Sequence, residues 1–179
     1  MEIAGRKIST GLIIGVILGI IVLWGIIWYN GTVSANEDVK GQWGKVESAY
    51  QRRADLIPNL VNTVKGYAKH ESDVLIQVTQ ARASVGQVKI DPSNMKAEDI
   101  QKFEQSQGAV SSAISRLLVV AEQYPDLKAN QNFLALQSQL EGTENRINTE
   151  RNYFNEVATA YNKRIQKIAY TILILLQNQ

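Results

Sequence analysis

The only histidine of this sequence lies beside acidic residues, and such a cluster is a candidate metal site. His70 is followed by Glu71 and Asp73. Zinc-protease helices require the spacing His-Glu-x-x-His, but Val74 occupies the position of the second histidine here. Because a metal site needs three or four suitably spaced ligands, we interpret His70 as a surface residue. The sequence therefore predicts no metal site and no cofactor.

The densest group of charged side chains is a candidate for acid–base chemistry. It comprises Glu141, Glu144, Arg146, Glu150 and Arg151. On a helix Arg146 and Glu150 are neighbours, whereas Glu144 and Arg146 project to different sides. Acid–base catalysis needs a substrate-sized pocket around the reacting pair, and a narrow helical bundle rarely provides one. We therefore prefer a structural polar network and predict no catalytic residue.

Two further patterns resemble catalytic motifs but lack an essential part. The glycine-rich segment 41–45 ends in lysine, yet its spacing differs from that of a phosphate-binding loop and no strand precedes it. Ser111, Ser112 and Ser115 have no histidine or lysine partner in a suitable context, so nothing would activate them as nucleophiles. The chain has no cysteine, which excludes thiolate metal sites and cysteine nucleophiles. We therefore predict that the protein is not an enzyme.

The charge balance argues against a nucleic-acid partner. The formal net charge is +2, and basic residues are interleaved with acidic ones. Arg52, Arg53, Lys65 and Lys69 form a basic region, but Asp55 offsets it. The aromatic residues nearby follow the buried side of a predicted helix rather than a basic face.

The helices that must position these side chains begin with a membrane span. Positions 11–29 are almost entirely apolar, close to the ~20 residues that a helix needs to cross a bilayer. Trp24, Trp28 and Tyr29 lie at the far end, where amphipathic rings anchor at the headgroup level. We predict a short cytoplasmic N-terminus at 1–10 and a transmembrane anchor at 11–30, with the lipid bilayer as partner.

Charged residues on either side predict the orientation of this anchor. Arg6 and Lys7 precede the span, whereas Glu37 and Asp38 follow it. The positive-inside bias places the N-terminus in the cytoplasm and the remaining chain outside. We predict a single-pass protein of the bacterial inner (cytoplasmic) membrane whose bundle is extracytoplasmic, that is, periplasmic.

A cleaved signal peptide is the alternative, since Val33-Ser34-Ala35 would suit cleavage after Ala35. However, the apolar run exceeds the ~7–15 residues of a signal-peptide core. Bulky Trp28 and Tyr29 also stand where a small, polar segment should begin. An uncleaved anchor is the preferred interpretation.

Gly11, Gly15 and Gly19 recur every four residues and share one side of the membrane helix. Stripes of small residues let two membrane helices approach closely, so this stripe predicts self-association. The alternative is compositional, because glycine is commoner in membrane helices than in soluble ones.

Apolar residues over 39–85 recur at steps of three, four or seven, which predicts one long helix with a buried seam. The seam consists of Val39, Trp43, Val46, Tyr50, Ile57, Val64, Leu75, Val78 and Val85. Arg53 and Glu71 fall in the same register, so each must find a polar partner or reach water. Pro58 removes one backbone donor and should kink or split this helix.

Two further amphipathic helices follow, separated by turn formers at Gly86, 91–94 and Pro125. The first has in register Ile100, Phe103, Gln107, Val110, Ile114, Leu117, Ala121 and Tyr124. The second has Phe133, Leu136, Leu140, Thr143, Ile147, Phe154, Val157, Tyr161, Ile165 and Ile168. The predicted fold is all-α: a transmembrane helix continuing into an antiparallel up-and-down bundle over 31–168. The bundle has three long helices, or four if the first splits near Pro58.

Antiparallel packing with turns near Gly86 and Pro125 brings Glu71 level with 143–147. We therefore predict contact between Glu71 and Arg146. Together with Arg53 and Glu144, they form the predicted structural polar network.

Two long blocks of this sequence carry a family resemblance. The first reads YQRRADLIPNLV at 50–61 and TVKGYA at 63–68. The second reads YPDLKAN at 124–130, Phe133, LQ at 136–137, LEGTENRI at 140–147 and YN at 161–162. This pattern resembles the LemA family and, with the anchor, spans about 13–162. The resemblance implies a small bacterial protein with one membrane anchor and a helical-bundle domain, and it implies no catalytic residues.

The end of the chain departs from this family's pattern. LemA-like proteins usually follow Tyr-Asn with Phe-Pro and a tail rich in Gly and Phe, whereas 169–179 is an apolar tail. A reading-frame change or natural divergence would produce it. The run 168–176 is too short to cross a bilayer, but Arg164 and Lys167 suit anionic headgroups while the apolar end dips into the membrane. The alternative is a tail that packs on the emerging anchor or stays disordered.

A long helix that begins at an anchor, without a catalytic constellation, favours a non-catalytic membrane scaffold. We predict that it self-assembles as a homo-oligomer or organises other proteins at the bacterial membrane. The alternative is a regulatory adaptor that binds a membrane protease or sensor through an exposed bundle face.

Overall fold

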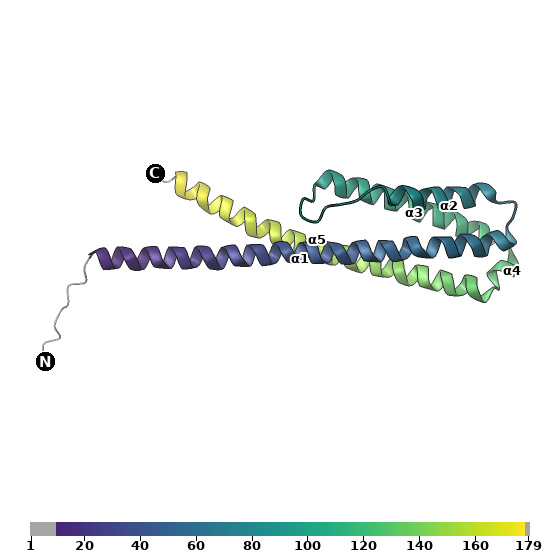
Figure 1. Cartoon of the computed structure of the whole chain (residues 1–179), viewed down its shortest axis with the longest axis horizontal. Helices are drawn as coiled ribbons and strands as arrows, with labels where there is room; N and C mark the ends of the chain where they lie inside the picture. Colours follow the sequence, from purple (N-terminus) through teal and green to yellow (C-terminus); the bar gives the residue numbers. More distant parts are fainter. Residues whose placement is uncertain (1–9, 178–179) are drawn as a thin grey trace, which may run out of the picture. The chain divides into compact units, whose positions relative to one another are not determined.

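The computed structural model describes residues 10–177, with side chains up to Lys167. Most of the predicted cytoplasmic segment, including Arg6 and Lys7, lies outside the described residues. Every regular element over 10–177 is a helix, which confirms the all-α prediction. In chain order the helices are α1 (Thr10–Tyr67), α2 (Ser72–Val85), α3 (Ala97–Ala121), α4 (Pro125–Lys128) and α5 (Gln131–Gln177) (Figure 1).

The chain divides into two compact units. The first is Lys40–Glu156, which we call the bundle unit. The second combines the part of the chain up to Val39 with the part from Val157, and we call it the terminal unit. The bundle unit lies within the stretch 31–168 that the sequence assigned to the helical bundle.

Pro58 lies inside α1, so the helix does not split there, which was one of the two predicted outcomes. A proline at position 58 has no N–H to donate to the carbonyl four residues earlier, which belongs to Ala54. The Nε atom of Arg82 on α2 donates a hydrogen bond to this carbonyl oxygen at 2.9 Å. A side chain thus replaces the donor that the proline lacks, and the helix continues to Tyr67.

The predicted rod over 39–85 is also wrong, because the chain turns at 68–71. The Arg82–Ala54 contact shows that α2 runs back along α1 (Figure 1). Two helices that fold back on each other each bury one apolar stripe. The apolar residues therefore recur in the sequence with the same spacing as in one long helix. Gly66 near the break and acidic Asp73 in the first turn of α2 were the available signals.

The third helix runs in the same direction as α1. At one end Arg53 on α1 donates to the Gln107 side chain on α3. Towards the other end the Tyr124 hydroxyl, just after α3, donates to Glu71, just after α1, at 3.3 Å. The sequence positions increase together along both segments, so α3 is parallel to α1 and antiparallel to α2.

The last helix runs against α1. Arg53 meets Glu144 at 2.7 Å, whereas the Asn130 amide, just before α5, donates to the Tyr67 hydroxyl at 2.9 Å. The bundle unit is therefore an up-and-down arrangement of α1, α2, α3 and α5, and the short α4 links α3 to α5. A four-helix arrangement is present, but its first turn lies at 68–71 rather than at Pro58.

The core of the bundle unit consists mostly of residues from the predicted seams. Buried apolar residues from α1 and α2 are Trp43, Val46, Tyr50, Ile57, Leu60, Val64, Leu75 and Val78; those from α3 and α5 are Phe103, Val110, Ile114, Leu117, Phe133, Leu140, Ile147 and Phe154. At one end four aromatic rings interlock edge to face: the Trp43 ring centroid lies 5.3 Å from Phe103 and 5.1 Å from Phe154, and Tyr50 lies 5.1 Å from Phe103. Such pairs add about 0.5–1.5 kcal/mol beyond area burial.

In the terminal unit, α1 and α5 are in contact at a glycine. The Arg164 guanidinium of α5 lies directly against Gly31 of α1, where an added Cβ would overlap it. A larger residue at position 31 would therefore require the end of the flexible Arg164 side chain to shift. Further along, α5 continues to Gln177, and the side chains of the predicted membrane-dipping run 168–176 lie outside the described residues.

Candidate functional site

The predicted membrane span occupies the first part of α1. Over 10–177 this is the one helix long and apolar enough to cross a bilayer, and none of its most apolar window is buried. Its large apolar side chains from Leu12 to Tyr29 are exposed except for that of Trp28, and Ile27 reaches 70%. A continuous apolar surface of this size marks contact with a membrane or another apolar partner. The segment fits a membrane anchor.

The residues predicted at the membrane interface lie on this segment. Trp24 and Tyr29 are exposed, and Trp28 is half-buried. Gly11, Gly15 and Gly19 are exposed as well. A Cβ added at Gly15 or Gly19 would meet no atom within 4 Å.

Inside the bundle unit, the most unusual side chain is Arg53, which is only 2% exposed. Its Nη1 donates to the hydroxyl of Ser111 at 2.6 Å and to Glu144 Oε1 at 2.7 Å. Its Nη2 donates to the backbone oxygen of Gln107 at 3.0 Å and to the side-chain Oε1 of the same residue at 2.6 Å. The guanidinium carbon also lies 5.1 Å from the centroid of the Tyr50 ring.

These contacts explain how a charged residue occupies an apolar seam. A buried cation loses its hydration and is tolerated only where several acceptors replace the water. The acceptors around Arg53 come from α3 and α5, so the guanidinium joins three helices. We call this group the arginine centre: Arg53, Gln107, Ser111 and Glu144.

The predicted network is therefore only partly present. Arg53 and Glu144 meet, but the predicted contact between Glu71 and Arg146 is wrong. Glu71 accepts a hydrogen bond from Tyr124, and Arg146 pairs along its own helix with Glu150 at 3.7 Å. The register was misplaced because α1 ends at Tyr67, so Arg53 rather than Glu71 lies level with 143–147.

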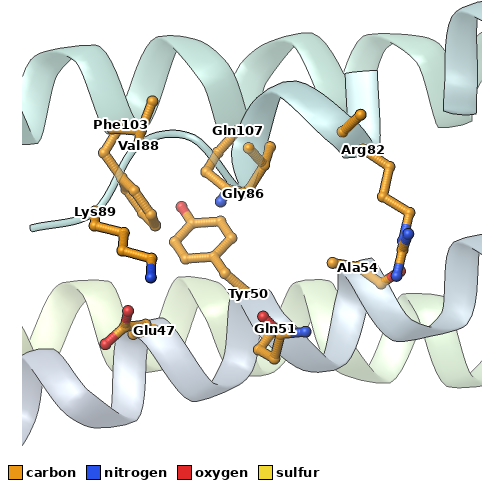
Figure 2. A pocket seen from close by; sticks show the side chains of 12 residues that line it. Glu47, Tyr50, Gln51, Ala54, Arg82, Gly86, Val88, Lys89, Phe103 and Gln107 are labelled. Carbon is orange, nitrogen blue, oxygen red and sulfur yellow. The ribbon is translucent and has the colours of Figure 1, made fainter. Parts of the chain in front are cut away.

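Beside the arginine centre, the bundle unit contains a hollow of about 380 Å³ between α1, the end of α2, the following loop and α3 (Figure 2). It is lined by Glu47, Tyr50, Gln51, Ala54, Arg82, Ala83, Val85, Gly86, Val88, Lys89, Phe103 and Gln107. We call it the tyrosine hollow. A narrow bundle rarely provides a substrate-sized space; here loop residues 86–89 help to form one by supplying one wall.

The Tyr50 hydroxyl points into this hollow (Figure 2). Burial raises the pKa of the Tyr50 phenol above its usual 10.0, and the positive charges of Arg151 and Arg53 partly offset this shift. The phenol is therefore protonated at neutral pH and acts as a hydrogen-bond donor rather than as a base.

The other sequence candidates lie in two places. His70 is exposed in the turn between α1 and α2, and over 10–177 no three His, Cys, Asp or Glu side chains gather as metal ligands. Ser111 accepts from Arg53, and Ser115 donates to the Ser111 carbonyl oxygen at 2.9 Å. Both serines line a second hollow of about 410 Å³, together with Glu141 and Glu144.

Sequence reasoning did not identify the tyrosine hollow, because its wall depends on where the loop after α2 returns to α1. One signal was present: Gln107 stands in the apolar register of α3, where a polar side chain requires a partner.

Curated relatives were found in several bacteria. The magnetosome protein MamQ of Magnetospirillum gryphiswaldense is 26% identical over 165 residues, covering 83% of this chain and 61% of the relative. Magnetosome protein MamQ 2 of Paramagnetospirillum magneticum gives the same identity and coverage. Protein LemA of Metamycoplasma hominis is 23% identical over 136 residues, covering 76% of this chain and 58% of the relative. The chain thus spans about three-fifths of the length of these relatives.

A family model described as the LemA family matches residues 42–177. The match includes the arginine centre, all the residues that line the tyrosine hollow and the whole of α2 to α5. Because it covers most of the sequence, the chain belongs to the LemA family.

Proposed function

We propose that this protein is a non-catalytic, membrane-anchored scaffold that self-assembles, or organises other proteins, at the bacterial inner membrane. The observation that carries the proposal is the exposed apolar segment of α1, which fits a membrane anchor. The charges around this segment favour a cytoplasmic N-terminus and an extracytoplasmic bundle.

The chemistry of the bundle unit supports a non-catalytic role. Its most buried charge, Arg53, is held by acceptors from neighbouring helices rather than aimed at a solvent-filled space. The tyrosine hollow contains no serine or histidine that could form a nucleophile–base pair. The matched relatives are also named for a cellular structure or for the family, not for a reaction.

Self-assembly is supported by the open glycine stripe on the anchor. Gly15 and Gly19 meet no atom within 4 Å of an added Cβ, so a second helix can approach their backbone. Replacing both by isoleucine should hold two such helices apart. Leu18→Ile on the same segment is the matched control, because it adds no bulk at the stripe.

The test measures the mass of the full-length protein in detergent by light scattering with sedimentation equilibrium. We expect a homo-oligomer for the parent and Leu18→Ile, and a smaller species for the double isoleucine variant. If all three have the same oligomeric mass, the stripe has no role in assembly. A monomeric parent would contradict self-assembly.

A monomeric parent would instead support the regulatory adaptor. The observation that favours this second candidate is a shallow groove of about 330 Å³ lined by Val61, Leu75, Ile76 and Thr79, among others. Ile76 is 51% exposed there. Crosslinking in cells from a residue placed at Ile76 would then identify a membrane protease or sensor, if the adaptor role is correct.

A further inference from the structure

The tyrosine hollow contains a buried hydrogen-bond donor that has no partner. Gln107 is 4% exposed, and its Oε1 accepts from Nη2 of Arg53 at 2.6 Å. Because arginine has no acceptor, this contact fixes which end of the amide faces Arg53. The Nε2 atom must face the other way, and it is buried without a hydrogen-bond partner. Such an atom costs stability unless something pairs with it.

A second donor points into the same hollow. Figure 2 shows the Gln107 nitrogen and the Tyr50 hydroxyl both directed into the space enclosed by α1, α3 and the loop. Burial keeps the Tyr50 phenol protonated. An acceptor atom placed between these two groups would satisfy both.

Cationic side chains stand around these donors. The Lys89 side chain extends from the loop into the hollow on the side of Glu47 (Figure 2). Arg82 lines the opposite end, where its Nε is occupied by the Ala54 carbonyl while its terminal nitrogens stay available. Glu47 is the one carboxylate lining the hollow. The lining therefore carries a small positive excess, and Glu47 would repel a ligand with several negative charges.

The remaining wall is apolar and aromatic. The rings of Tyr50 and Phe103 and the side chains of Val85 and Val88 line the hollow. Its volume of about 380 Å³ falls within the range of about 300–1,000 Å³ that small-molecule sites occupy. Small-molecule sites combine such apolar surface with a few placed polar groups, and the lining here contains both kinds of residue.

We propose that the tyrosine hollow binds a small organic monocarboxylate with an aromatic or branched apolar body. The carboxylate accepts hydrogen bonds from Gln107 Nε2 and the Tyr50 hydroxyl, and Lys89 provides the countercharge. The apolar body lies against Tyr50, Phe103 and Val85. This site is independent of the proposed scaffold role, because neither the anchor nor its glycines take part.

Binding of para-trifluoromethylbenzoate to the full-length protein in lipid nanodiscs tests this proposal by fluorine NMR. The uncharged probe para-trifluoromethylbenzyl alcohol has a similar body without the carboxylate, and empty nanodiscs give the partitioning into lipid. We expect saturable binding of the benzoate to the protein. The alcohol should bind at least about tenfold more weakly, because it cannot form charge-assisted hydrogen bonds.

Three variants locate the site. Lys89→Gln and Tyr50→Phe should each weaken benzoate binding, by about tenfold for Lys89→Gln and less for Tyr50→Phe, because the lysine contributes a full charge. Lys89 is exposed, so its substitution leaves the fold intact. Lys69→Gln, which removes an exposed lysine from the turn at 68–71, is the matched control and should bind like the parent.

Specific results overturn the proposal. Absence of benzoate binding at the solubility limit of the probe does so directly. Equal binding of benzoate by the parent and by Lys89→Gln assigns the signal to another part of the protein. Equal affinity for the alcohol shows an apolar cavity without a carboxylate site. None of these results bears on the scaffold role, which the mass measurements decide.

Discussion

The hydrogen bond from Arg82 to Ala54 makes a sharp prediction about how α1 tolerates Pro58. Arg82→Met keeps much of the side-chain length but removes the donor, so the Ala54 carbonyl loses its partner. In a Pro58→Ala background the restored backbone N–H can donate to that same carbonyl. We therefore expect Arg82→Met to destabilise the parent more than it destabilises the Pro58→Ala variant.

The size of the effect follows from the position of the bond. A hydrogen bond contributes about 0.5–1.5 kcal/mol net, and a fully buried unpaired group costs about 1–3 kcal/mol. Ala54 is half-buried and Arg82 is exposed, so water can reach the carbonyl once the arginine is removed. We therefore expect a cost of about 1 kcal/mol in the parent, near zero in the Pro58→Ala background, and a coupling of about 1 kcal/mol.

The measurement is a double-mutant cycle by urea unfolding of the full-length protein in nanodiscs, followed by far-ultraviolet circular dichroism. Arg146→Met is the matched control, because it removes an exposed arginine whose nearest acidic partner is on its own helix. This control should show no coupling to Pro58. Equal costs of Arg82→Met in both backgrounds would refute the idea that the arginine replaces the missing proline donor.

Three further predictions concern the arginine centre, the tyrosine hollow and the topology. Arg53→Met should lower the free energy of unfolding by about 3 kcal/mol, the lower end for a broken buried pair, because Glu144 is 41% exposed. Glu144→Gln should lower it by less. Equal, small decreases for the two variants in urea unfolding would contradict this prediction. Tyr50 should ionise at higher pH than an exposed tyrosine in alkaline ultraviolet titration, because burial raises its pKa. This raised folded-state pKa contributes stability below pH 10.0, and the contribution is lost as the pH rises through the folded-state pKa. Tyr50→Phe should remove this loss of stability. A phosphatase reporter fused after Lys163 should be active if the bundle is extracytoplasmic, whereas activity of a cytoplasmic reporter alone would reverse the orientation.

Much of the core was predictable from the sequence, since the spacing of apolar residues identifies which side of each helix is buried. Trp43, Val64 and Val78 were all expected in the seam and are buried. The turn at 68–71 was not predicted, because the spacing continues across it without interruption. The sequence pointed to Pro58 as the possible break in the first helix. It could not show that Arg82, which is distant in sequence, donates to the Ala54 carbonyl oxygen in place of the missing proline N–H.

The polar interior was predictable only in part. A charged residue in an apolar register needs partners, and this placed Arg53 and Glu144 in one network. The remaining partners of Arg53 depended on the register between α1 and α5. Because the turn at 68–71 was not predicted, the predicted register was wrong by many residues. The tyrosine hollow depends on the path of loop 86–89, which no periodic pattern encodes.

The helix α2 fully buries fewer side chains than α3 does. The arginine centre links α1, α3 and α5 and includes no residue of α2. Within α2 only Leu75 and Val78 are buried, whereas α3 buries seven side chains. Segments with few buried contacts open at lower free energy than the rest of a fold, so amide hydrogens of α2 should exchange ahead of those of α3. Since Arg82, Val85 and the loop after them form one wall of the tyrosine hollow, local opening of α2 would remove that wall and change the shape of the hollow.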